Sequence, residues 1–320
     1  MNAPSSRKKA PPGLASIRQG REDRLRGKFA RPTTNTWLLL GAGLVGSIVA
    51  YQVIAGRQLA AKQTALLGKQ RAIDATLGAE WKPLREKVET ATLEAAKTWK
   101  GDFIAPDFKD FRSRPGVFLR MRVADAGSVA TLRKAAEDSS RDSFVACLIR
   151  PAVAKAAKAN APVVEPWNLR QAYGSTRILT DAWVEEMKAS TDDLRLRVFE
   201  QQYEKAMKDE IPLAIDVVKK AEYFLLVLDE DVPAAAEASG GHPTLDVLEQ
   251  FAHPARVHAF ELPSGKELAR VKRETTAEAR IVADNGAIGP DSQRAMQRQV
   301  NNCAIAQEVG AYLDTAALPK

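Results

Sequence analysis

Histidine and cysteine, which often bind metals or act in catalysis, are scarce in this chain. Its 320 residues include three histidines and two cysteines. The histidines, His242, His253 and His258, have none of the spacings typical of a metal site, and we expect all three at the surface. The serine-hydrolase pattern GxSxG and the zinc-protease pattern HExxH are both absent. The sequence therefore predicts no cofactor and favours a protein that is not an enzyme.

The folded part of the chain lacks an excess of charge of either sign. The whole chain has 47 Lys or Arg and 40 Asp or Glu, a net charge of +7. The first 35 residues hold nine basic and two acidic residues, so the remainder has 38 of each. A nucleic-acid-binding domain usually concentrates basic residues on one face, and we therefore expect no nucleic-acid partner. The basic tail instead suits a topology signal and contact with anionic lipid headgroups.

Only one apolar run is long enough to cross a lipid bilayer. Trp37–Ala55, WLLLGAGLVGSIVAYQVIA, has nineteen residues and no charge. A helix of that length spans about 30 Å, the thickness of the hydrocarbon core. We predict a transmembrane helix at 36–56. The alternative is a signal peptide cleaved after Val53–Ala55, but the run is longer than usual and follows a long segment.

The charges that flank this run predict its orientation. Nine basic residues precede it, whereas the twenty residues after Ala55 contain four. Positively charged flanks stay in the cytoplasm. We therefore predict a disordered cytoplasmic tail at 1–35 and a domain outside the cytoplasm, held at the inner membrane of a bacterial envelope. The absence of an Asn-x-Ser/Thr sequon agrees with that location.

Small residues recur on one face of the predicted span. Ala42, Gly46 and Ala50 are spaced by four, with Gly43 and Ser47 beside them. Such a face allows two helices to approach closely in lipid. It predicts a homodimer through the transmembrane helix.

The rest of the chain predicts a helical stalk at 57–100, with Pro83 in the first turn of its second helix, and an α/β or α+β domain at 101–320. Alternating apolar residues at 117–123 indicate a half-buried strand. Continuous apolar runs at 144–149 and 223–228 indicate strands covered on both faces, the second of them central in the sheet. A hairpin is expected from 256–262 and 267–273, which gives a mixed sheet of about five strands.

Helical periodicity predicts the other elements of the domain. We expect helices at 128–138, 169–187, 194–221 and 290–313, the last with Met296, Val300, Cys303, Ala304 and Val309 as its inward positions. The second and third form a helical hairpin inserted into the sheet or laid over it. The Ala- and Pro-rich segment at 151–165 predicts a connection, and the Gly- and Pro-rich segment at 231–243 predicts a loop.

Three consecutive acids, Asp229, Glu230 and Asp231, follow the predicted central strand. Ligands of open α/β sheets bind at the carboxyl ends of strands, so these acids are the candidates for a cation or for an acidic catalytic site. Acids are also common at the starts of solvated loops that have no function.

Cys147 and Cys303 predict a disulfide. Thiols outside the cytoplasm are usually paired, and the two cysteines lie on elements that we expect to pack together. The alternative is two separate buried thiols.

The sequence favours a noncatalytic envelope protein whose domain binds another envelope protein. An extracytoplasmic enzyme acting at Asp229–Asp231 and a membrane sensor are the alternatives. The short polar tail argues against a sensor, because it cannot fold into a signalling domain.

Overall fold

The computed structural model describes residues 34–108, 111–139, 143–150, 164–274 and 289–316. The chain divides into two compact units, residues 1–62 and 63–320. Most of the predicted disordered tail and most of the predicted connection at 151–165 lie outside the described residues.

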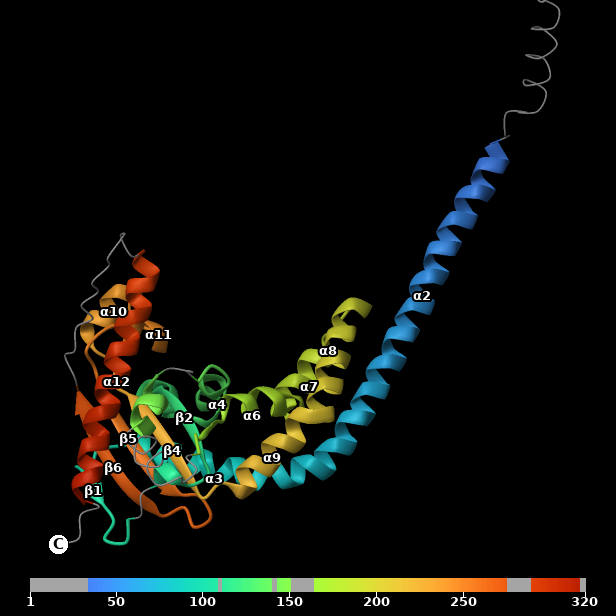
Figure 1. The fold of residues 1–320 in the computed structure, drawn as a ribbon. Coiled ribbons are helices and arrows are strands. Elements are labelled where there is room, and N and C mark those ends of the chain that lie inside the picture. Colours follow the sequence, from blue (N-terminus) through green and yellow to red (C-terminus); the bar gives the residue numbers. More distant parts are fainter. Residues whose placement is uncertain (1–33, 109–110, 140–142, 151–163, 275–288, 317–320) are drawn as a thin grey trace, which may run out of the picture. The chain divides into compact units, whose positions relative to one another are not determined.

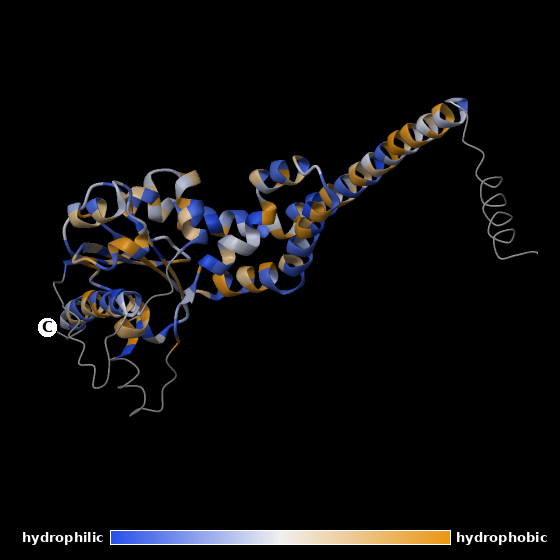
Figure 2. Cartoon of the chain, turned by 90° about the horizontal axis from the view of Figure 1, so that it is seen from above, coloured by the Kyte–Doolittle hydropathy of each residue, from blue (hydrophilic) through white to orange (hydrophobic). Residues whose placement is uncertain are grey.

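The first unit contains the beginning of helix α2 (Thr34–Ile73). Its apolar side chains are exposed: Leu39 and Tyr51 each expose 74% of their surface. Figure 2 shows apolar residues along this part of the helix. Within the described residues, this is the one helix long and apolar enough to cross a membrane, and none of its apolar window is buried. Such a helix fits a membrane anchor and an N-terminal signal sequence alike.

The predicted stalk is helical through Ala96, with no break at Gly68. A π-helical turn, η1 (Asp74–Gly78), separates α2 from α3 (Ala79–Ala96). Pro83 was expected in the first turn of a new helix but lies inside α3. From Gln63 onward these helices belong to the second unit and contribute buried side chains to it, including Leu66, Trp81 and Val88.

The second unit is built on a mixed six-stranded sheet with the order β1-β6-β5-β4-β2-β3 (Figure 1). The strands are β1 (Phe103–Ile104), β2 (Gly116–Arg122), β3 (Trp167–Asn168), β4 (Tyr223–Asp229), β5 (Pro254–Glu261) and β6 (Glu267–Glu274). β2 is parallel to β3 and β4, and the other pairs are antiparallel. The sequence predicted about five strands. The edge strands β1 and β3 were not predicted, because two residues are too few to show the apolar-polar alternation of a strand.

Helices connect the strands and cover both faces of the sheet. They are α4 (Val129–Glu137), α6 (Arg170–Thr176), α7 (Asp181–Lys188), α8 (Asp193–Lys205), α9 (Ile211–Lys220), α10 (Pro233–Ser239), α11 (Leu245–Leu248) and α12 (Pro290–Ala316). Residues 144–150 are also helical. The helix at 144–150 and α12 pack on the face of Phe118, Leu225 and Val257. α4 and α9 contact β2, and α3 contacts β4.

The prediction of a strand at 144–149 is wrong. Phe144, Val145, Leu148 and Ile149 are buried and Ala146 is exposed. This spacing is the buried stripe of a helix, and a short apolar run does not distinguish it from a buried strand.

The predicted half-buried strand at 117–123 is buried on both faces as β2. Phe118 and Arg120 are as inaccessible as Val117 and Leu119, because helices cover both sides of the strand.

Three other expectations need correction. The helix predicted at 169–187 is interrupted at Thr180, whose hydroxyl accepts a hydrogen bond from Trp183 N and so begins α7. The loop predicted at 231–243 contains α10, which ends at Gly240 with φ of 74°. Met296, predicted to face inward on the last helix, is 40% exposed, whereas Ile305 and Val309 are buried.

Candidate functional site

Asp229, the first of the three candidate acids, is completely buried at the carboxyl end of β4. Arg120 of β2 donates two hydrogen bonds to it, from Nε to Oδ2 at 2.7 Å and from Nη2 to Oδ1 at 2.8 Å. Burial opposes ionisation of Asp229. The positive charge of Arg120 and the hydrogen bonds from His253 and Arg120 outweigh burial and hold the pKa of Asp229 well below its usual range.

His258 of β5 and His253 are both buried, contrary to the expected surface positions, and His253 lies beside this pair. Its Nε2 lies 2.9 Å from Asp229 Oδ1, and its Nδ1 lies 2.9 Å from the Phe251 carbonyl oxygen. Burial lowers the pKa of His253, but the hydrogen bond and charge of Asp229 dominate and raise it. Both ring nitrogens are occupied within the fold, so neither is directed at an external substrate.

Residues of neighbouring elements extend the cluster around Arg120 and Asp229. Glu249, after α11, has its Oε1 3.3 Å from Arg120 Nη1. Asn301 of α12 donates to the carbonyl oxygens of Glu249 and Phe251 at 2.9 and 3.2 Å. These contacts connect α11 and α12 to the strand ends and indicate a structural network.

The other two candidate acids face different partners. Glu230 accepts hydrogen bonds from Arg256 at 2.6 Å and from Lys272 at 2.7 Å, and Asp231 lies 3.3 Å from Arg122. Burial opposes ionisation of Glu230, yet its bonds to Lys272 and Arg256 lower its pKa. Each of the three acids therefore has its own arginine. Within the described ranges no three His, Cys, Asp or Glu residues are grouped to hold a metal ion.

One glycine motif was missed in the sequence. Gly41–Gly46, GAGLVG, has the GxGxxG spacing of dinucleotide-binding loops. That motif acts where a strand turns into a helix, whereas these glycines lie inside α2. The same part of α2 holds the predicted packing residues Ala42, Gly43, Gly46, Ser47 and Ala50, all of them exposed.

The structure joins Cys147 and Cys303 in a disulfide, with their α-carbons 5.1 Å apart. Cys147 belongs to the helix at 144–150 and Cys303 to α12, so the bond links two helices on the same face of the sheet.

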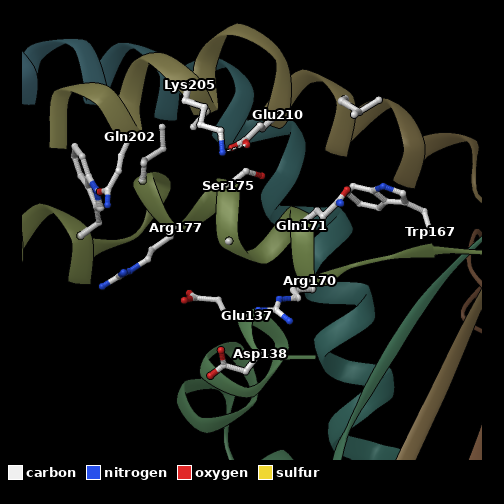
Figure 3. A pocket seen from close by; sticks show the side chains of 15 residues that line it. Glu137, Asp138, Trp167, Arg170, Gln171, Ser175, Arg177, Gln202, Lys205 and Glu210 are labelled. Carbon is white, nitrogen blue, oxygen red and sulfur yellow. Dashed lines mark hydrogen bonds and ion pairs between the residues drawn. The ribbon is translucent and has the colours of Figure 1, made fainter. Parts of the chain in front are cut away.

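An open cleft of about 660 Å³ lies between α4, α6 and the run formed by α8, the π-helical turn η5 (Ala206–Glu210) and α9. Figure 3 shows Glu137 and Asp138 of the α4 end on one wall, Lys205 and Glu210 on the opposite wall, and α6 between them. Its other lining residues include Trp167, Arg170, Gln171, Arg177, Trp183 and Gln202. We call this space the helical cleft.

Three charged residues of the helical cleft have no ion-pair partner in the described part of the chain: Glu137, Asp138 and Arg170. Burial raises the pKa of Glu137, and this effect exceeds the opposing attraction of Arg177. The other basic residues in the walls are paired, Lys205 with Glu210 at 2.9 Å and Arg177 with Glu186 at 2.6 Å. The cleft thus offers charged groups of both signs to a ligand.

A second cleft, of about 710 Å³, adjoins the first and shares Asp138 and Arg170 with it. Its walls come from α11 and α12, including Asp246, Arg298 and Asn302. Arg298 is paired with Asp246 at 2.8 Å, so Arg170 again supplies unpaired positive charge.

No protein-family model, curated protein or solved structure matches this chain. Functional inference therefore depends on the geometry of the site itself.

Sequence reasoning missed the residues that distinguish these sites. An arginine in the middle of an apolar strand, as in Val117-Phe118-Leu119-Arg120-Met121, was a usable signal, because such a residue requires a buried acid as partner. Glu137 and Arg170 gave no comparable signal, because only tertiary packing brings them into one cleft.

Proposed function

We propose that this chain is a single-pass membrane protein whose C-terminal domain lies outside the cytoplasm and binds another protein of the envelope without catalysing a reaction on it. The observation that supports binding most directly is the helical cleft with its unpaired Glu137, Asp138 and Arg170. The acids at the strand ends support the noncatalytic part of the proposal, because Asp229, Glu230 and Asp231 are paired with residues of the domain itself.

The exposed apolar part of α2 supports the membrane anchor. No described part of the chain buries the side chains of this apolar window. Exposed apolar surface of this extent usually marks a membrane or protein contact. Ala42, Gly46 and Ala50 give the anchor a face for homodimer formation. The nine basic residues before it favour a cytoplasmic N-terminus.

The lining of the helical cleft favours a polypeptide partner. Small-molecule sites are mostly apolar and enclosed, whereas this cleft is open and lined by amide groups, charged groups and indole rings. Amide side chains such as Gln171 and Gln202 can pair with a peptide backbone. Glu137 and Arg170 suit side chains of opposite charge on the partner.

In-cell photocrosslinking of the full chain tests this proposal. A photoreactive amino acid at Gln171, in the wall of the cleft, should give a discrete protein adduct. The charge reversal Arg170→Glu should greatly reduce that adduct, because it replaces the unpaired cation with an anion.

The matched control is Lys97→Glu, which reverses a charge on an exposed side chain at the end of α3. It should leave the adduct unchanged. An adduct that forms equally well in the Arg170→Glu chain, or no adduct from Gln171 at all, would contradict binding in this cleft.

A further inference from the structure

Hydrogen bonds connect the turn between α7 and α8 to Gln63, the first residue of the second unit. Gln63 Nε2 donates to the Ser190 carbonyl oxygen at 2.8 Å and lies 3.4 Å from the carbonyl oxygens of Met187 and Lys188. Carbonyl groups at the end of a helix need such partners, because the helix itself supplies none. The position of the turn is therefore set by a residue near the apolar run.

Chain length keeps this turn close to the end of the apolar run. Gln63 follows Ala55 by eight residues, which is about 12 Å along a helix and at most about 28 Å when extended. The headgroup layer adds about 5–8 Å to each side of the hydrocarbon core. Residues 55–63 are helical within α2. If the apolar run is the anchor proposed above, Gln63 therefore lies about 4–7 Å beyond the headgroup layer, and the turn that it binds lies next to that layer.

The N-terminal part of α8 exposes aliphatic side chains beside this turn. Leu194 is 76% exposed and Val198 is 47% exposed. They are four residues apart and so share one face of the helix, whereas Leu196 and Phe199 on the other side are buried. The exposed face is not part of the core of the domain.

An exposed arginine accompanies the two aliphatic residues. Arg195 has no ion-pair partner in the ranges that the structure describes, whereas Arg197 is paired with Asp193 at 2.9 Å. Aliphatic side chains next to an unpaired arginine suit a lipid surface, where the alkyl part contacts the acyl boundary and the guanidinium contacts phosphate.

We propose that the first turns of α8, with Leu194, Arg195 and Val198, bind the surface of the bilayer that holds the anchor. The inference rests on the proposed membrane anchor and adds a second point of contact with lipid. A contact of this kind would restrict how the domain is oriented at the membrane.

Depth-dependent quenching tests the contact in the full chain. The variant Leu194→Cys is labelled with a fluorophore, and the protein is reconstituted in vesicles of phosphatidylcholine and phosphatidylglycerol that contain a headgroup nitroxide lipid. The exposed position tolerates substitution, and the native cysteines are joined and leave one thiol to label. The matched control is Leu213→Cys, an exposed leucine nineteen residues further along the same helical run.

We expect the label at position 194 to be quenched at least about twofold more than the label at 213, since interfacial helices insert about 5–10 Å into the headgroup boundary. Adding Arg195→Glu should weaken the quenching at 194. Equal quenching at both positions in protein that floats with the vesicles would overturn the lipid contact and leave the anchor intact. Protein that does not float with the vesicles would overturn the anchor and, with it, the contact.

Discussion

Arg120 and Asp229 meet on neighbouring parallel strands, joined by hydrogen bonds of 2.7 and 2.8 Å, and neither side chain is accessible to solvent. Removing two such charges from water costs several kcal/mol per ion, and the pairing offsets this cost only while both partners are present. The pair also positions His253. The buried cluster of Arg120, Asp229 and His253 is therefore explained by folding, and the proposed binding is assigned to the clefts.

The first prediction concerns stability. Asp229→Asn should lower the free energy of unfolding by about 3–5 kcal/mol, because it removes the closest counter-charge of the buried Arg120 and leaves Glu249, at 3.3 Å. Replacing both partners, as Arg120→Met with Asp229→Leu, should cost less than the single change. Denaturant unfolding of the full chain in detergent, followed by circular dichroism, measures both.

A surface pair provides the control for this prediction. Asp216 pairs with Lys220 at 2.7 Å on the exposed side of α9, and Asp216→Asn should cost less than about 1 kcal/mol. Equal losses for the buried and the exposed substitution would show that the Arg120–Asp229 pair has no special role.

The second prediction concerns pH. Folding raises the pKa of His253, so its contribution to stability is complete below the unfolded pKa of about 6.5 and is lost as pH rises through the folded value. Folding lowers the pKa of Asp229, so its contribution is present above about pH 3.8 and is lost only in stronger acid. Stability should therefore decline as pH rises above about 6.5.

Two histidine variants test whether His253 causes this decline in stability. His253→Gln should remove it, whereas His242→Gln, at an exposed position, should preserve it. The measurement is the free energy of unfolding from denaturant titrations at a series of pH values. A decline that persists in His253→Gln would have to come from another group.

Regular patterns in the sequence predicted much of the fold. The central strand β4, the β5–β6 hairpin and α12 follow from apolar runs, turn residues and helical spacing, all of which are local signals. The helix at 144–150 was missed because its run is too short for its period to separate helix from strand. β1 and β3 were missed because two residues carry no period at all.

The candidate site was less predictable, because its residues come from distant segments. Asp229 was found in the sequence as an acid at a strand end, but its partner Arg120 precedes it by 109 residues. His253 was expected at the surface because no local pattern marks a buried histidine. Similarly, Glu137 and Arg170 share a cleft only because α4 and α6 pack together.

The third prediction concerns the link between Cys147 and Cys303. Their bond closes a separation of 156 residues, and chain entropy gives an upper value of about 5 kcal/mol for its contribution to stability. Cys147→Ser should lower the free energy of unfolding by a substantial part of that amount in oxidised protein. It should have little effect once the protein is reduced, and denaturant unfolding with and without a thiol reductant provides the comparison.

The oxidation state in the cell stays a separate prediction. Thiols should be trapped in intact cells with a mass-tagged alkylating agent and the protein resolved without reductant. We expect no labelled cysteine, since disulfides persist outside the cytoplasm. Two labelled cysteines would argue for reduced thiols and against an extracytoplasmic domain.

The central claim, an anchored domain outside the cytoplasm, is tested most directly by reporter fusions to the two ends of the full chain. An enzyme that is active only outside the cytoplasm is fused after Lys320 in one version and before Met1 in the other. Because nine basic residues precede the apolar run and the twenty residues after it contain four, the C-terminal fusion should be active and the N-terminal fusion inactive. The reverse pattern, an inactive C-terminal fusion with an active N-terminal one, would contradict the account.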